Sequence, residues 1–210
     1  MTTGGVPGDG GGGEEALSAT DWAVLGLLGE GPAHGFALAA TLAPGGDLGR
    51  VWTLPRPVVY QALRRLRSAE LVVPVATQSS QVGPNRTILT LTRLGHERLD
   101  RWLDQPVGHV RDVRSLLLVK LALLDRRGRS LRPLAQRQRA TLRPALAALR
   151  EEARQAEGFD RVVAAWRLAS YEATDAFLAG LLADPAGRRA SPAPAAAEPP
   201  GEETPAVGSA

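Results

Sequence analysis

The most informative stretch of this chain of 210 residues is PVVYQALRRLRSA, residues 57–69. At about 100° per residue, its apolar side chains fall on one face of a helix. These are Val59, Ala62, Leu63 and Leu66. The opposite face carries Pro57, Gln61, Arg64 and Ser68, and proline suits the first turn of a helix because no backbone donor is needed there. The stretch therefore predicts an amphipathic helix that packs by its leucines and turns a polar face outward.

Two shorter helices are predicted before this stretch. Ser18 is followed three residues later by Asp21, a spacing that resembles a capping box, and apolar residues at helical spacing continue as far as Gly29. A second helix is expected over His34–Ala43, and the sequence Pro-Gly-Gly at residues 44–46 stops it. The three helices together indicate a helix-turn-helix arrangement.

A hairpin and a fourth helix are predicted after it. The stretches Leu71–Ala76 and Arg86–Leu91 are β-like, and a polar loop separates them. Thr92 is suited to cap a helix that ends near Asp104. The order of helix, helix, helix, hairpin and helix is that of a winged helix-turn-helix, so we expect a mainly α fold with a small two-stranded β wing.

The second half of the chain is expected to be helical. Asp112–Leu124 is apolar nearly all round, which predicts burial on several sides. Ser130 is expected to cap a long helix with a narrow leucine stripe, which Pro144 should kink or interrupt, and a last helix begins at Asp160. Such stripes fit packing on a partner helix and predict a dimerisation surface. Its candidate residues are Leu131, Leu142, Leu146, Leu149, Val163, Trp166, Phe177 and Leu181.

The outer face of the 57–69 helix has the chemistry of a surface that reads nucleic acid. Glutamine can pair with adenine and arginine with guanine in the major groove, which makes Gln61 and Arg64 candidate base contacts, with Pro57 beside them. Three neighbours could reach phosphates, namely Arg56, Tyr60 and Arg65. The face alone fits a solvated helix equally well. The hairpin favours nucleic acid, because a wing with Asn85 and Arg86 at its base can clamp the backbone beside the groove.

Three stretches carry a family resemblance. VLGLLGEGPAHGFALAATL (residues 24–42), VYQALRRLRSAELV (residues 59–72) and LTRLGHERLDRWL (residues 91–103) resemble, in order and separation, the corresponding motifs of PadR-family regulators. The resemblance implies a dimeric winged-helix transcriptional regulator, usually a repressor and often released by a small molecule. It also implies that the C-terminal helices form the dimer.

The chain departs from this family at the expected interface. The Gly-Thr that commonly precedes the recognition tyrosine is replaced by residues 57–59, and Phe36 stands where the family commonly has tyrosine. The wing has Arg86 as its only base. Phosphate anchoring is therefore expected to rest more on the arginines of the helices and the preceding loop, which are Arg50, Arg56, Arg64 and Arg65.

Composition excludes several other classes of protein. The chain has no cysteine, and its three histidines lie in separate elements with no carboxylate at ligand spacing, so we expect no metal and no cofactor. No catalytic motif is present, so we do not expect an enzyme. With no long apolar run and no secretory signal, the chain is expected to be cytoplasmic and not in a membrane. The one lysine, Lys120, is expected to be paired or to reach the surface rather than to contact a ligand.

Four segments are predicted. Residues 17–105 form the DNA-binding domain and residues 110–183 the helical dimerisation domain, and the tails 1–16 and 184–210 are expected to be disordered because of their composition. The hypothesis is a homodimer that binds an inverted repeat in duplex DNA. The alternative is a winged helix that binds another protein and has no affinity for DNA.

Overall fold

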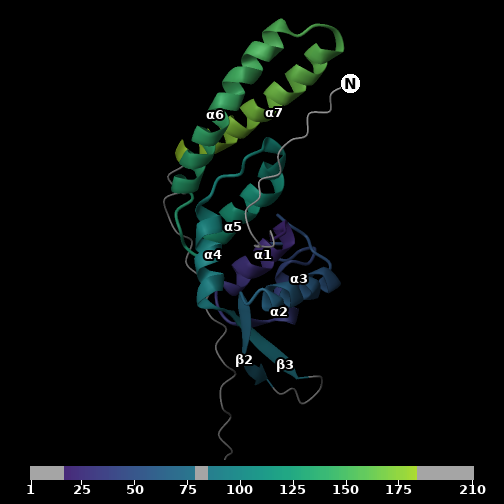
Figure 1. Ribbon diagram of the computed structural model, residues 1–210, viewed down its shortest axis with the longest axis vertical. Helices are drawn as coiled ribbons and strands as arrows, with labels where there is room; N and C mark the ends of the chain where they lie inside the picture. Colours follow the sequence, from purple (N-terminus) through teal and green to yellow (C-terminus); the bar gives the residue numbers. More distant parts are fainter. Residues whose placement is uncertain (1–16, 79–84, 184–210) are drawn as a thin grey trace, which may run out of the picture.

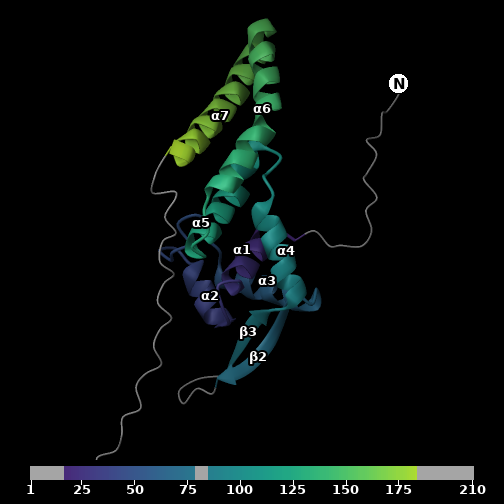
Figure 2. The same ribbon diagram turned by 90° about the vertical axis from the view of Figure 1, so that its left-hand side faces the viewer.

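The computed structural model describes residues 17–78 and 85–183. The expected disordered tails and most of the wing loop lie outside these residues. The helices are α1 (Ala19–Leu28), α2 (Gly35–Thr41), α3 (Arg56–Ser68), α4 (Arg93–Asp104), α5 (Leu118–Arg126), α6 (Arg132–Gln155) and α7 (Gly158–Ala183). The strands are β1 (Ala33–His34), β2 (Val72–Gln78) and β3 (Arg86–Leu91). The wing lies at one end of the molecule and the α6–α7 hairpin at the other (Figures 1 and 2).

Helix α1 lies at the centre of the N-terminal core. The predicted capping box is confirmed, because Ser18 Oγ accepts from the Asp21 amide at 3.2 Å and the Asp21 carboxylate accepts from the Ser18 amide at 3.0 Å. From Ala23 onward α1 is buried, and α5 packs directly on it. A Cβ at Gly26 would overlap the side chain of Leu123, so glycine sets how closely the two helices approach. The core therefore continues from the first helices into α5, across the boundary expected near residues 106–109.

The wing is a sheet of three strands in the order β1-β3-β2, where the sequence predicted two. The additional strand pairs Ala33 with Leu89 and His34 with Ile88, both antiparallel. Two residues are too few to show the alternation that marks a strand in a sequence. His34 also caps α2, because its Nδ1 accepts from the Ala37 amide at 3.0 Å. The base of the wing is thus tied to the start of α2.

The helical second half differs in detail from the prediction. The stretch expected as one helix over Asp112–Leu124 is a 3-10 turn (Val110–Asp112), a π-helical turn (Val113–Leu117) and then α5. Helix α6 begins at Arg132, and Ser130 is not its cap, since the capping position is Leu131 and Ser130 Oγ only accepts from the Arg132 amide at 3.4 Å. Pro144 does not interrupt α6. Its position is exposed, so water can satisfy the carbonyl that the proline leaves without a donor.

Helices α6 and α7 form a long antiparallel hairpin (Figure 1). Its inner face is made by Leu142, Leu146, Leu149, Ala164 and Leu178, all of which are buried. Arg139 and Asp175 form a paired ion contact across the hairpin at 2.7 Å, and hydrogen bonding from Arg139 lowers the pKa of Asp175. The three leucines of α6 that were candidates for the dimer surface are therefore covered within one chain.

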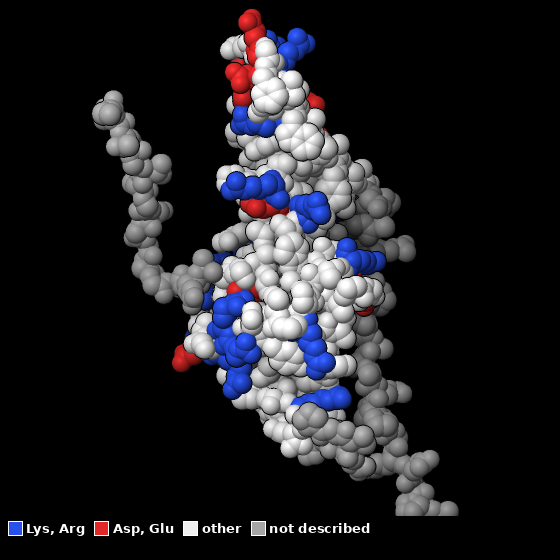
Figure 3. Space-filling view, turned by 90° about the vertical axis from the view of Figure 1, so that its right-hand side faces the viewer, with Lys and Arg blue, Asp and Glu red and all other residues white. Residues whose placement is uncertain are grey.

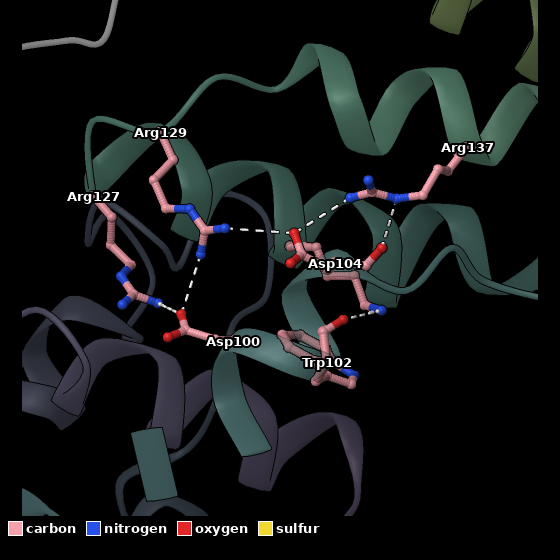
Figure 4. Close-up of polar contacts among 7 residues, drawn as sticks. Asp100, Trp102, Asp104, Arg127, Arg129 and Arg137 are labelled. Carbon is pink, nitrogen blue, oxygen red and sulfur yellow. Dashed lines mark hydrogen bonds and ion pairs between the residues drawn. The ribbon is translucent and has the colours of Figure 1, made fainter. Parts of the chain in front are cut away.

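Polar contacts join the hairpin to the winged helix (Figure 4). Asp100 accepts from Arg127 and Arg129 at 3.1 Å each, and Asp104 pairs with Arg129 and Arg137 at 3.4 and 3.3 Å. The end of α4 is thereby tied both to the loop after α5 and to the first turns of α6.

Lys120 contacts the same end of α4 from α5. It is buried and donates to the carbonyl oxygens of Trp102 and Gln105 at 2.7 and 2.6 Å, and its Nζ lies 4.5 Å from the Trp102 ring centroid. Trp102 stacks on Trp22 at 4.7 Å. Burial lowers the pKa of Lys120 to about 8. The prediction of a paired lysine is confirmed, and its partners are the carbonyls at the C-terminal end of α4.

Candidate nucleic-acid interface

Helix α3 presents an open polar face. It begins after Pro55 with Pro57 in its first turn, and Val59, Ala62, Leu63 and Leu66 hold it on the core. Gln61 and Arg64 are exposed on the opposite side. Arg67, which was not among the sequence candidates, is exposed as well, and no ion pair involves Arg64 or Arg67 within residues 17–78 and 85–183. This face therefore offers hydrogen-bond donors and positive charge without a competing carboxylate.

Arg65 is placed differently from the other arginines of α3. Its Nε and Nη2 donate to Asp21 Oδ1 at 3.0 and 2.7 Å. The Asp21 side chain is 4% exposed, and its other oxygen accepts from Ser18. One carboxylate therefore completes the cap of α1 and pairs with α3. The charge of Arg65 is compensated, so its structural task is to hold α3 on α1, and its candidacy as a phosphate contact is weakened.

A cluster around Phe36 brings three elements together. Phe36, from α2, is 48% exposed, and the Arg56 guanidinium carbon of α3 lies 4.9 Å from its ring centroid. The guanidinium carbon of Arg86, from β3, lies 5.7 Å from the same centroid. Arg56 also lies 5.7 Å from the Tyr60 ring. The start of α3 and the base of the wing thus meet over one aromatic side chain, which sequence reasoning noted only for its missing hydroxyl.

The remaining candidates surround this cluster. Tyr60 is half-buried against the start of α2, since a Cβ at Gly35 would lie 2.9 Å from its ring. Asn85 is exposed just before β3, and Arg50 is exposed in the segment between α2 and α3. Figure 3 shows basic side chains predominating over acidic ones on the lower half of the side that it presents, where the wing, α2 and α3 lie. This end of the molecule is suited to a polyanion.

The candidate dimer residues of α7 lie on the opposite end. Trp166 is 74% exposed, and Val163 and Phe177 are exposed on the same helix, together with Phe159 and Val162. Leu131 and Leu181 are half-buried. Five large exposed apolar side chains on one face of a helix are uncommon on a monomer and are typical of an interaction surface.

A shallow apolar cavity, open to solvent on one side, adjoins this stripe. It has a volume of about 340 Å³ and lies between α7 and the turns that precede α5, with Val113, Leu118 and Phe177 among its lining residues. Arg114 supplies a positive charge at its wall. Within the described part of the chain, no group of three histidine or acidic side chains could hold a metal ion, and no helix is both long and apolar enough to cross a membrane.

The family resemblance is confirmed by comparison. Residues 24–101 match the family described as the transcriptional regulator PadR-like family. No curated protein matches the chain.

The chain is also similar to solved structures. The crystal structure of Bacillus subtilis PadR in complex with operator DNA is 19% identical, with 78% of this chain and 97% of that chain covered and a TM-score of 0.40. The structure of the same protein with p-coumaric acid is 21% identical, with coverage of 79% and 98% and a TM-score of 0.36. A Streptococcus mutans protein is 16% identical, with coverage of 78% and 98% and a TM-score of 0.37.

Proposed function

We propose that this chain, whose residues 24–101 belong to the PadR-like family of transcriptional regulators, is a repressor that binds an inverted repeat in duplex DNA as a homodimer. The observation that carries the proposal is the exposed face of α3, where Gln61 and Arg64 have no carboxylate partner among the described residues. Residues 17–105 supply this DNA-binding surface. Residues 110–183 supply the dimer surface.

The proposed contacts follow from the chemistry of the side chains. With α3 in the major groove, Arg64 donates two hydrogen bonds to guanine, and Gln61 pairs with adenine. Arg50, Arg56 and Arg86 neutralise phosphates on either side of the groove. In a dimer, two copies of α3 would contact half-sites about one helical turn apart, which requires an operator with two-fold symmetry.

The first experiment selects duplexes from a random pool and measures the affinity of the purified chain for the selected sequence over a series of salt concentrations. The log of the affinity should fall with the log of salt, with a slope of about −0.9 for each phosphate contact. The double substitution Gln61→Ala and Arg64→Ala should weaken specific binding by at least about 10-fold, since one bidentate base contact contributes about 1–3 kcal/mol.

A matched control is available on α6. Gln136 and Arg143 are exposed there, and the double substitution Gln136→Ala and Arg143→Ala removes the same two side-chain types far from α3. This control should bind like the wild type. Absence of salt-sensitive affinity for any duplex would contradict the proposal and favour a winged helix that binds protein.

The dimer surface proposed here is the exposed stripe of α7. Its five large side chains, Phe159, Val162, Val163, Trp166 and Phe177, are exposed in the isolated chain. Trp166→Glu should convert the dimer to a monomer in analytical ultracentrifugation and abolish binding to the full inverted repeat while leaving the helix content unchanged. A Trp166→Glu chain that remains dimeric would place the interface elsewhere.

Release by a small molecule is the remaining part of the proposal. The cavity beside α7 is apolar with one arginine at its wall, which suits a small apolar molecule that carries an anionic group. The cavity adjoins the proposed dimer stripe, and a ligand that binds one dimer geometry more tightly shifts the population toward that geometry. The substitution Val113→Trp, which fills the cavity from the wall opposite α7 and lies outside the stripe, should leave operator binding intact and remove the response to an effector found by screening.

A further inference from the structure

Phe36 is an exposed aromatic side chain with two positive charges over its ring. Arg56 reaches it from the first turn of α3, and Arg86 reaches it from the first residue of β3. The two distances of 4.9 and 5.7 Å limit the separation of the guanidinium carbons to about 11 Å. Two like charges at this distance repel each other, and the negative face of the ring offsets part of that repulsion.

The choice of an aromatic partner has an electrostatic consequence. A carboxylate would orient an arginine and also cancel its charge, as Asp21 does for Arg65. An aromatic ring orients a guanidinium by its quadrupole and leaves the net charge in place. Among residues 17–78 and 85–183, no ion pair involves Arg56 or Arg86, so both keep their full charge for an external anion.

The position of the cluster favours DNA phosphates as that anion. Arg56 lies on the helix proposed to enter the major groove, and Arg86 lies on the wing beside it. One DNA strand carries a phosphate about every 3.4 Å of helix axis, so two guanidiniums within about 11 Å can contact two phosphates of the same strand.

We propose that Phe36 is a positioning residue, which holds Arg56 and Arg86 together as one phosphate clamp between the recognition helix and the wing. The inference rests on the proposed function and assigns to this side chain a task within it. Because the ring orders both arginines before DNA arrives, less side-chain freedom is lost on binding. The aromatic ring carries this role, so the hydroxyl of a tyrosine is not needed for it.

The test uses the full-length chain and a mixed-sequence duplex of about 30 base pairs, because phosphate contacts supply nearly all non-specific binding. Phe36→Leu keeps an apolar side chain of similar size and removes the ring. It should weaken binding at low salt by about 5- to 10-fold, whereas Phe36→Tyr and Phe36→Trp should bind within about 2-fold of the wild type. The melting temperature of each variant is measured beside its affinity.

A double-mutant cycle separates positioning from a general structural role. In a chain that already carries Arg56→Ala and Arg86→Ala, the Phe36→Leu substitution should cause no further loss of affinity. A loss of the same size in both backgrounds would overturn the inference, as would wild-type affinity for Phe36→Leu. If the wild-type chain itself has no salt-sensitive affinity for the duplex, the proposed function fails and this inference fails with it.

Discussion

Replacing Asp21 by alanine is expected to lower the free energy of unfolding by about 2–3 kcal/mol. Asp21 is 3% exposed and uses both oxygens, one for the cap of α1 and the other for Arg65 of α3. The substitution removes both interactions at once. It therefore tests whether this carboxylate holds α3 on the core.

The magnitude follows from the two interactions taken separately. Loss of a helix cap costs about 1 kcal/mol. Hydrogen bonds to a charged group contribute about 1.5–3 kcal/mol, and we take the lower part of that range because the Arg65 side chain is 45% exposed and can be solvated when it loses its partner. Since a loss of 1 kcal/mol in the free energy of unfolding lowers the melting temperature of a chain of this size by about 2–4 °C, Asp21→Ala should lower the melting temperature by about 5–10 °C.

The assay is thermal and urea unfolding followed by circular dichroism, with a double-mutant cycle between Asp21→Ala and Arg65→Ala. Arg65→Ala should destabilise the chain, while Arg64→Ala, one residue earlier on the same helix, should change stability by no more than about 0.5 kcal/mol. The coupling energy of the cycle should be about 1–2 kcal/mol. Equal effects of Arg64→Ala and Arg65→Ala on stability, or no coupling, would refute the reasoning.

Three further predictions concern the packing of the domain. Burial lowers the pKa of Lys120 from its ordinary value of 10.5 to about 8, so between these two pH values the unfolded chain binds more protons than the folded chain. The free energy of unfolding of the wild type should therefore rise with pH relative to that of Lys120→Met, as urea titrations from pH 7 to pH 10.5 can measure. A stability difference between the two chains that stays constant over this pH range would contradict the prediction. Gly95→Ala should lower the melting temperature strongly, because a Cβ at this position would overlap the carbonyl oxygen of Leu71. A melting temperature within about 2 °C of the wild type would contradict this packing. Arg126→Ala should lower the free energy of unfolding by about 1 kcal/mol, because Arg126 pairs with Glu30 at 2.7 Å. Urea unfolding should show a smaller loss of stability at high salt than at low salt. An equal loss at both salt concentrations would argue against an ionic contribution.

Local signals in the sequence predicted most of the winged helix. The cap by Ser18, the cap by Thr92 and the first-turn position of Pro57 each depend on residues within four positions of one another, so spacing alone reveals them. The exposed and buried faces of α3 follow from helical periodicity in the same way. These elements required no knowledge of tertiary contacts.

Features that depend on distant residues could not be predicted in this way. Arg65 lies on the flank of α3, but the carboxylate that pairs with it comes from 44 residues earlier in the chain. The leucine stripe of α6 indicates a partner helix, yet periodicity cannot tell whether that helix belongs to the same chain, and here α7 covers Leu142, Leu146 and Leu149. The cluster at Phe36 joins three elements, so no single stretch of sequence contains it.

The α6–α7 hairpin is long enough that a small rotation at its foot is amplified at its tip. Helix α6 has 24 residues and is therefore about 36 Å long, so a rotation of about 5° at its foot displaces its far tip by about 3 Å. The ion pairs of Asp104 with Arg129 and Arg137 lie at that foot. Together with those of Asp100, these contacts hold the foot of a long arm against the winged helix, and any change of angle there is magnified at the far tip.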